Sequence, residues 1–169
     1  MAILATGLIA MAQLFTVATK NNVNARATTS STILANQKLE QLRSMSWGFD
    51  VIGLPVSDFN SDSTTLPPSA SGGTGLSPSP GNTLTDNVPG YVDYIDRLGQ
   101  ALGTGSAPPA GTAYVRRWSI EPLPTNPNNT LIIQVMVFET GNRPASGDTA
   151  TTRLPNEARV ATVKTRKAL

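Results

Sequence analysis

Residues 1–45 read MAILATGLIAMAQLFTVATKNNVNARATTSSTILANQKLEQLRSM, and this stretch decides the fold because no proline interrupts it. Its first nineteen residues are uncharged, and Lys20 is the first charge in the chain. A helix of that length spans roughly 28 Å, close to the thickness of a bilayer's hydrocarbon core. Residues 1–19 are therefore predicted to form a membrane helix, with its apolar surface supplied by Met1, Ile3, Leu4, Leu8, Ile9, Met11, Leu14, Phe15 and Val17.

Two other interpretations of residues 1–19 stay open. A secretory signal peptide needs basic residues before its apolar core, and none precedes this one. A helix of this length in a globular core should show polar positions along one side, and residues 1–19 show no clear polar side. The small residues Ala2, Ala5, Ala10 and Ala12 favour close contact between helices inside an assembly.

The helical signal continues through residues 20–47, with an amphipathic pattern. Ala35, Leu39 and Leu42 recur at helical spacing and form one apolar stripe, which is predicted to pack on the rest of the protein. Lys38 and Arg43 flank that stripe. Residues 21–32 are rich in Asn and Thr, which are poor helix formers, so a bend or a melted stretch is expected there.

Residues 48–90 differ sharply in composition. They are rich in Pro, Gly, Ser and Thr and have little apolar content, so an exposed connecting loop that buries no core is predicted. The glycines at 72, 73 and 75 lack the Gly-Lys-Ser/Thr sequence and the preceding strand of a phosphate-binding loop.

Residues 91–169 are predicted to form a sheet domain. Strand patterns cover 91–96, 114–121, 131–139 and 159–165, and the segments between them are too short for crossover helices. The predicted fold class is therefore α+β: a long N-terminal helix, hydrophobic and then amphipathic, packed on an antiparallel sheet of about four strands.

The composition argues against catalysis. The chain has no Cys and no His, which removes thiolate chemistry and the commonest general base and metal ligand. No carboxylate pair lies in an apolar context that would shift a pKa, and Asp86, Asp93 and Asp96 match no known calcium loop. We therefore expect no enzyme activity, no cofactor and no metal, and the net charge of +2 gives no indication of a nucleic-acid partner.

Arg116, Arg117 and Trp118 form the most distinctive polar motif. Two arginines beside an indole allow an anion site with a cation–π component. The interpretation we favour is a strand in which one arginine faces solvent and the other stacks across neighbouring strands.

Three segments together resemble type IV pilins and pseudopilins, most closely the minor pilins of the type IV pilus modification protein kind. They are LANQKLEQLRSM at 34–45, YVDYID at 91–96 and YVRRWSI at 114–120. The resemblance implies a pilin-like fold, with residues 1–19 in the filament core and Arg116, Arg117 and Trp118 in a family strand. Members of these families carry a basic leader, a Gly-Phe-Thr-Leu-x-Glu sequence and a further first part of the mature helix. We expect that this sequence lacks all three.

The resemblance implies a structural subunit of a bacterial type IV pilus or related secretion filament. Its partners would be other pilin subunits, the inner membrane before assembly and the prepilin peptidase for the precursor; its final location would be a periplasmic or extracellular filament. Two alternatives stay open: a surface adhesin or binding module presented on such a filament, and an unrelated domain with a single-helix membrane anchor.

Overall fold

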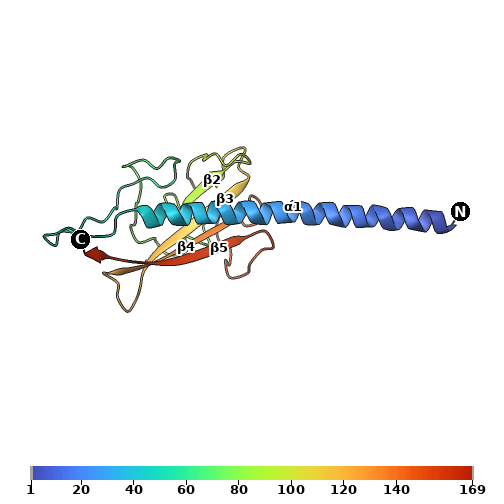
Figure 1. The fold of residues 1–169 in the computed structure, drawn as a ribbon. Helices are drawn as coiled ribbons and strands as arrows, with labels where there is room; N and C mark the ends of the chain where they lie inside the picture. Colours follow the sequence, from blue (N-terminus) through green and yellow to red (C-terminus); the bar gives the residue numbers. More distant parts are fainter. Residues whose placement is uncertain (1, 169) are drawn as a thin grey trace.

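The computed structural model describes residues 2–168, with side chains described for residues 7–166. The chain has an α+β fold, as predicted: one N-terminal helix and a four-stranded antiparallel sheet. Figure 1 shows the helix running past the sheet and extending well beyond it. The elements are α1 (Ala2–Ser44), β1 (Gly48–Phe49), β2 (Val92–Ile95), β3 (Tyr114–Pro122), β4 (Thr130–Glu139), β5 (Ala158–Thr165) and β6 (Lys167–Ala168).

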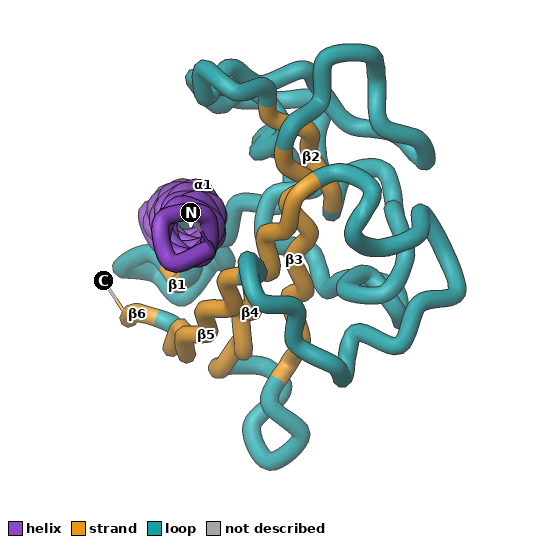
Figure 2. The backbone as a smooth tube through the Cα atoms, turned by 90° about the vertical axis from the view of Figure 1, so that its right-hand side faces the viewer, coloured by secondary structure: helices purple, strands orange, loops and turns teal. Residues whose placement is uncertain are grey.

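The sheet is an antiparallel meander with the strand order β2-β3-β4-β5. β3 and β4 form its centre and pair along nearly their full length, from Tyr114 opposite Glu139 to Pro122 opposite Leu131. A second pairing was not foreseen from the sequence: β1 and β6 form a short parallel ribbon, with Gly48 opposite Lys167. This ribbon ties the chain just after the helix to the end of the chain (Figure 2).

α1 is a single unbroken helix, so the expectation of a bend or melted stretch in residues 21–32 is wrong. The hydroxyls of Thr28, Thr29 and Thr32 each donate to the carbonyl four residues earlier, at 3.0, 2.9 and 2.8 Å. These hydroxyls find acceptors within the helix itself. Ala27 and Ser31 are also buried, so tertiary packing holds this stretch helical despite its weak propensity.

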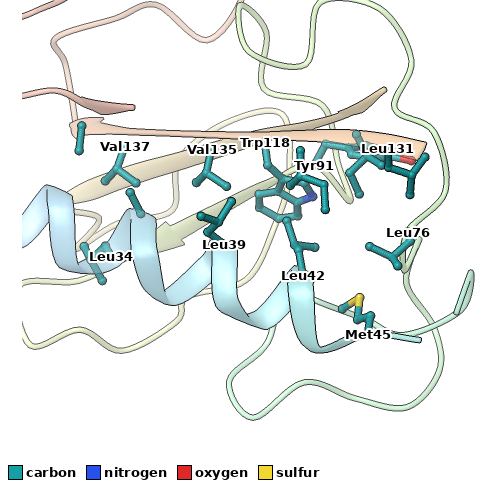
Figure 3. Close-up of a cluster of buried hydrophobic side chains, with 14 of the residues drawn as sticks. Leu34, Leu39, Leu42, Met45, Leu76, Tyr91, Trp118, Leu131, Val135 and Val137 are labelled. Carbon is teal, nitrogen blue, oxygen red and sulfur yellow. The ribbon is translucent and has the colours of Figure 1, made fainter. Parts of the chain in front are cut away.

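Each face of the sheet has its own hydrophobic cluster. On one face, α1 packs on side chains of β3 and β4, with Leu39 and Leu42 lying against Trp118 and Val135 (Figure 3). The other face is covered by loops and contains Val92, Tyr94, Val115, Met136, Phe138 and Ala150. Strand alternation divides neighbouring residues between the two clusters.

The connecting segment 48–90 contributes to the core, so the prediction that it buries nothing is wrong. Leu76 is fully buried in the cluster between helix and sheet. Ser63, Thr64 and Thr83 are buried as well. Val88 and Leu84 of the same segment pack against the two clusters. The low overall apolar content of the segment did not indicate that these few residues reach the core.

Candidate functional site

The most distinctive surface of the protein is the N-terminal half of α1. Every residue from 7 to 23 is exposed, and Ala27 is the first buried residue in the part of the helix whose side chains are described. Phe15 is 77% exposed, which is unusual for a large aromatic side chain. The stretch projects from the domain without contacting it (Figure 1). Its exposed large apolar residues are Leu8, Ile9, Met11, Leu14, Phe15, Val17 and Val23.

The structure thus places six of the predicted membrane or filament-core residues on one projecting rod. Met1 lies outside the described residues, and so do the side chains of Ile3 and Leu4. Hydroxyls within the rod are satisfied internally: Thr16 donates to the Ala12 carbonyl and Thr19 to the Phe15 carbonyl, both at 2.9 Å. Within the part of the chain that the structure describes, no helix combines the length and apolarity needed to cross a membrane.

The C-terminal half of α1 holds the rod on the domain. Ala35 and Leu42 are fully buried and Leu39 nearly so, all in the cluster between helix and sheet. The helix lies over β4 and β5, and polar side chains on its outer face, such as Asn36 and Glu40, are exposed. The predicted stripe is therefore the part of the helix that faces the sheet (Figure 3).

A buried ionic group, the junction cluster, joins helix and sheet beside this stripe. It consists of Lys38 on α1, Asp93 on β2, Arg116 on β3 and the ring of Trp118. Arg116 donates from Nε and Nη2 to the two oxygens of Asp93, both at 2.8 Å. Lys38 Nζ lies 2.8 Å from Asp93 Oδ2 and 4.2 Å from the centre of the Trp118 ring. The carboxylate of Asp93 therefore pairs with two cations, and all three charged side chains are buried.

The junction cluster also binds the backbone of the helix and of the connecting segment. Arg116 Nη1 donates to the Leu34 carbonyl at 3.0 Å, and Lys38 Nζ donates to the Ser63 carbonyl. Burial lowers the pKa of Lys38 to about 8, an effect that Asp93 opposes and Arg116 reinforces. The geometry satisfies both cations with oxygen acceptors and leaves no approach for an external ligand, because all three charged residues are buried.

Arg117 points to the opposite face and is also fully buried, so the expectation that one of the two arginines faces solvent is wrong. Its guanidinium donates to Asn87 Oδ1 at 2.8 Å and to the carbonyls of Leu84, Thr85 and Pro144 at 3.0, 2.8 and 2.6 Å. It also lies 5.0 Å from the Phe138 ring centre. A planar guanidinium group can donate several hydrogen bonds at once. Arg117 thereby connects the loops around residues 84–87 and 144 to the sheet.

The described residues hold no group of His, Cys, Asp or Glu that could bind a metal ion. Asp86 accepts from the Gly147 amide, Asp93 belongs to the junction cluster, and Asp96 caps a turn. The polar groups of this domain therefore hold loops and the helix in place. The ion pair between Lys38 and Asp93 was not predicted from the sequence. A signal was available for Lys38, because it lies three residues after Ala35 and four before Leu42, on the buried stripe.

Comparisons with protein-family models, with curated proteins and with solved structures found no match to this chain.

Proposed function

We propose that this protein is a structural subunit that assembles through the exposed half of α1. The observation that carries the proposal is the run of apolar side chains from Leu8 to Val23 that nothing in the described chain covers. Burying one large apolar side chain contributes about 1.5–3 kcal/mol, so covering seven of them contributes on the order of 10 kcal/mol. Exposed apolar surface of this size marks an interaction site.

The chemistry of the rod suits contact with other helices. Its large apolar residues alternate with small ones, Gly7, Ala10 and Ala12 among them, which let helix backbones approach closely. Its threonine hydroxyls are satisfied within the helix, so they carry no penalty when water is removed. Large apolar side chains lie on several sides of the rod, with Gln13 and Lys20 among them, and apolar surface on several sides suits a position among like helices.

Within this class we propose a minor pilin or pseudopilin, working in a type IV pilus or a related secretion filament. Support comes from the three segments that resemble those families and from the layout of a long helix laid over a four-stranded antiparallel sheet. In this proposal the subunit is held in the bacterial inner membrane before assembly and is processed from a longer precursor by prepilin peptidase. The sheet domain faces outward in the filament.

Disulfide cross-linking tests the proposal. Because the chain has no cysteine, a single introduced thiol is the only one present. Leu14→Cys places a thiol on the rod, and Ser71→Cys places one on an exposed part of the connecting segment 48–90 as the control. Under mild oxidation of the full chain, we expect disulfide-linked dimers from the Leu14→Cys variant and few from the control. Sedimentation of the wild-type chain should show association that Phe15→Asn reduces and that Ser71→Asn, in the exposed connecting segment, does not.

Equal cross-linking at the two positions, or association unaffected by Phe15→Asn, would count against assembly through the rod. A protein that only uses its helix as a membrane tether would sediment as a monomer in detergent and would yield no rod-to-rod disulfide. That outcome would favour the simple anchor over the filament subunit.

A further inference from the structure

A cavity of about 460 Å³ opens where the end of α1, the start of the connecting segment and the end of β5 meet. We name it the helix-end cavity; it is lined by residues 43–48, Val56 and residues 163–165. These stretches lie together at the end of the molecule opposite the projecting rod (Figure 1). Binding pockets for small molecules occupy roughly 300–1,000 Å³, so this cavity is large enough for a small ligand.

The charged side chains that line the helix-end cavity are positive. Arg43 comes from α1 and Lys164 from β5, and no Asp or Glu is among the described residues of the lining. Arg43 Nη1 lies 2.7 Å from Glu40 Oε1, in an exposed ion pair. Lys164 Nζ donates to the Arg43 carbonyl, which holds the ammonium beside the end of the helix. Two cations and the one anion paired with them leave a net charge of +1 at the cavity.

Apolar side chains form another part of the wall. Met45 and Trp47 from the end of the helix line the cavity together with Val56 and Val163. The two valines are 38% and 61% exposed, so they present apolar surface to a molecule that enters. An apolar group that covers this surface removes it from water, which is favourable. The cavity therefore combines a positive charge with an apolar wall.

Two nitrogen donors at this site have no acceptor. Trp47 lines the cavity and is only 8% exposed, and its Nε1 makes no hydrogen bond. The Arg166 guanidinium stacks on the Trp47 ring, 4.4 Å from its centre, and on the Phe49 ring, 4.3 Å from its centre. The Nε of Arg166 is also buried without a partner. Buried donors in folded proteins are nearly always paired. Because both unpaired groups are donors, an acceptor oxygen complements them.

We propose that the helix-end cavity binds a monocarboxylate carried on a short apolar chain. The carboxylate lies between Arg43 and Lys164, with the Trp47 indole N–H as its neutral donor. The apolar chain packs on Met45, Val56 and Val163. Hydrogen bonds from cations to a carboxylate are stronger than those between neutral groups, so the charged end fixes the orientation of the ligand.

The electrostatics favour one negative charge over the two of a phosphate. The net charge of +1 at the cavity balances a single carboxylate. The carbonyls at the C-terminal end of α1 also carry a negative partial charge, which disfavours a second negative charge beside them. Such a carboxylate has two sources, a small organic acid and the C-terminal end of a polypeptide. Both present the same chemical group to the cavity.

The first arm of the test follows the two indole signals in ¹H–¹⁵N spectra of the full chain, which contains two tryptophans. Trp47→Phe identifies the signal that belongs to the cavity. We expect hexanoate to shift this signal saturably, with a millimolar dissociation constant for so small a ligand, and hexanol to leave it unchanged. The Trp118 Nε1 is also unpaired, but this residue is fully buried and does not line the cavity, so its signal should stay in place.

The second arm uses variants at exposed positions. Val163→Glu places a fixed carboxylate on the lining and should weaken hexanoate binding by about tenfold or more, because two like charges then share one small site. Val163→Gln has nearly the same shape without the charge and should bind like the wild type. Arg43→Gln should also weaken binding by about tenfold, the effect of one lost charge-assisted hydrogen bond. Its control is Lys20→Gln, which removes an exposed cation at the other end of α1.

A third arm distinguishes the two sources. The probes are the acetylated tripeptide Ala-Val-Leu with a free carboxylate and the same tripeptide with an amide at that end. Binding of hexanoate alone assigns the site to small organic acids, and binding of the free-acid peptide assigns it to a chain end. Both results support the carboxylate site, provided that the peptide amide does not bind.

Four results overturn the proposal. They are a Trp47 signal that neither hexanoate nor the free-acid peptide shifts, an equal shift by hexanol, equal binding of the peptide amide, and a saturable shift by inorganic phosphate at lower concentrations than hexanoate. Unchanged hexanoate binding by Val163→Glu would place the ligand elsewhere on the chain and would also refute it. The Val163 variants should unfold at the wild-type urea midpoint, because the side chain is exposed.

Discussion

Lys38 provides a pH test of the junction cluster. In the folded protein the pKa of Lys38 is lowered to about 8 from 10.5, because burial outweighs the attraction of Asp93. The other charges facing it are Arg116 on β3 and Asp62 in the connecting segment. At neutral pH the folded protein therefore bears a cost for keeping this amine protonated, and the unfolded chain does not.

The sign and size of the effect follow from proton linkage. Between pH 8 and 10.5 the unfolded state binds more protons than the folded state, so the free energy of unfolding rises with pH. Integrating the two pKa values gives a gain of about 2 kcal/mol between pH 7 and pH 9.5. Tyr91 and Tyr94 have raised pKa values through burial, so their ionisation opposes the trend only at higher pH.

The assay is urea unfolding of the full chain, followed by circular dichroism at half-unit steps from pH 7 to 9.5. The control is Lys38→Met, which keeps an unbranched side chain and leaves Asp93 paired with Arg116. We expect the wild-type urea midpoint to rise across this range and the variant midpoint to stay level. A wild-type curve as flat as that of Lys38→Met, or one that falls, would refute the burial argument for this cluster.

Three further predictions concern the same domain. Asp93→Asn leaves two buried cations without a counter-charge, so its free energy of unfolding should fall by about 3–5 kcal/mol, measured in urea at pH 7. Leu42→Ala opens a cavity under the helix at a fully buried position, so the free energy of unfolding, measured by thermal denaturation, should fall by about 2–5 kcal/mol. The control is Ile33→Ala at an exposed position of the same helix. A smaller fall for Leu42→Ala than for this control would contradict the packing. Arg117→Lys cannot reach the same set of carbonyls, so amide exchange should speed up in residues 84–87 and 144–148 while α1 stays protected, and unchanged exchange there would count against it.

The elements with strong periodicity could be predicted from the sequence. The spacing of Ala35, Leu39 and Leu42 marked the buried side of the helix, and alternation from Leu131 to Val137 marked the core side of β4. Both signals are local, because the residues that share a face lie within a few positions of one another. Such patterns require no knowledge of distant partners.

The ionic contacts could not be predicted, because their partners are far apart in the sequence. Lys38 and Asp93 meet only when the helix lies on the sheet to which β2 belongs. Alternation placed Arg116 and Arg117 on opposite faces, and it could not show that loops around Asn87 and Pro144 cover the second of them. The parallel pairing of β1 with β6 involves two residues on each side, too few to leave a pattern.

The unbroken course of α1 also has a mechanical meaning. Because no proline, bulge or bend separates the rod from the half that packs on the sheet, the two halves behave as one stiff shaft. Each residue of an α-helix turns the chain by about 100°. In the assembly that we propose, the number of residues between Val17 and Ala27 would therefore fix the angle at which the sheet domain faces outward from the packed rod. One residue more in that interval would rotate the whole domain by more than a quarter-turn, whereas seven would bring it back to within about 20°.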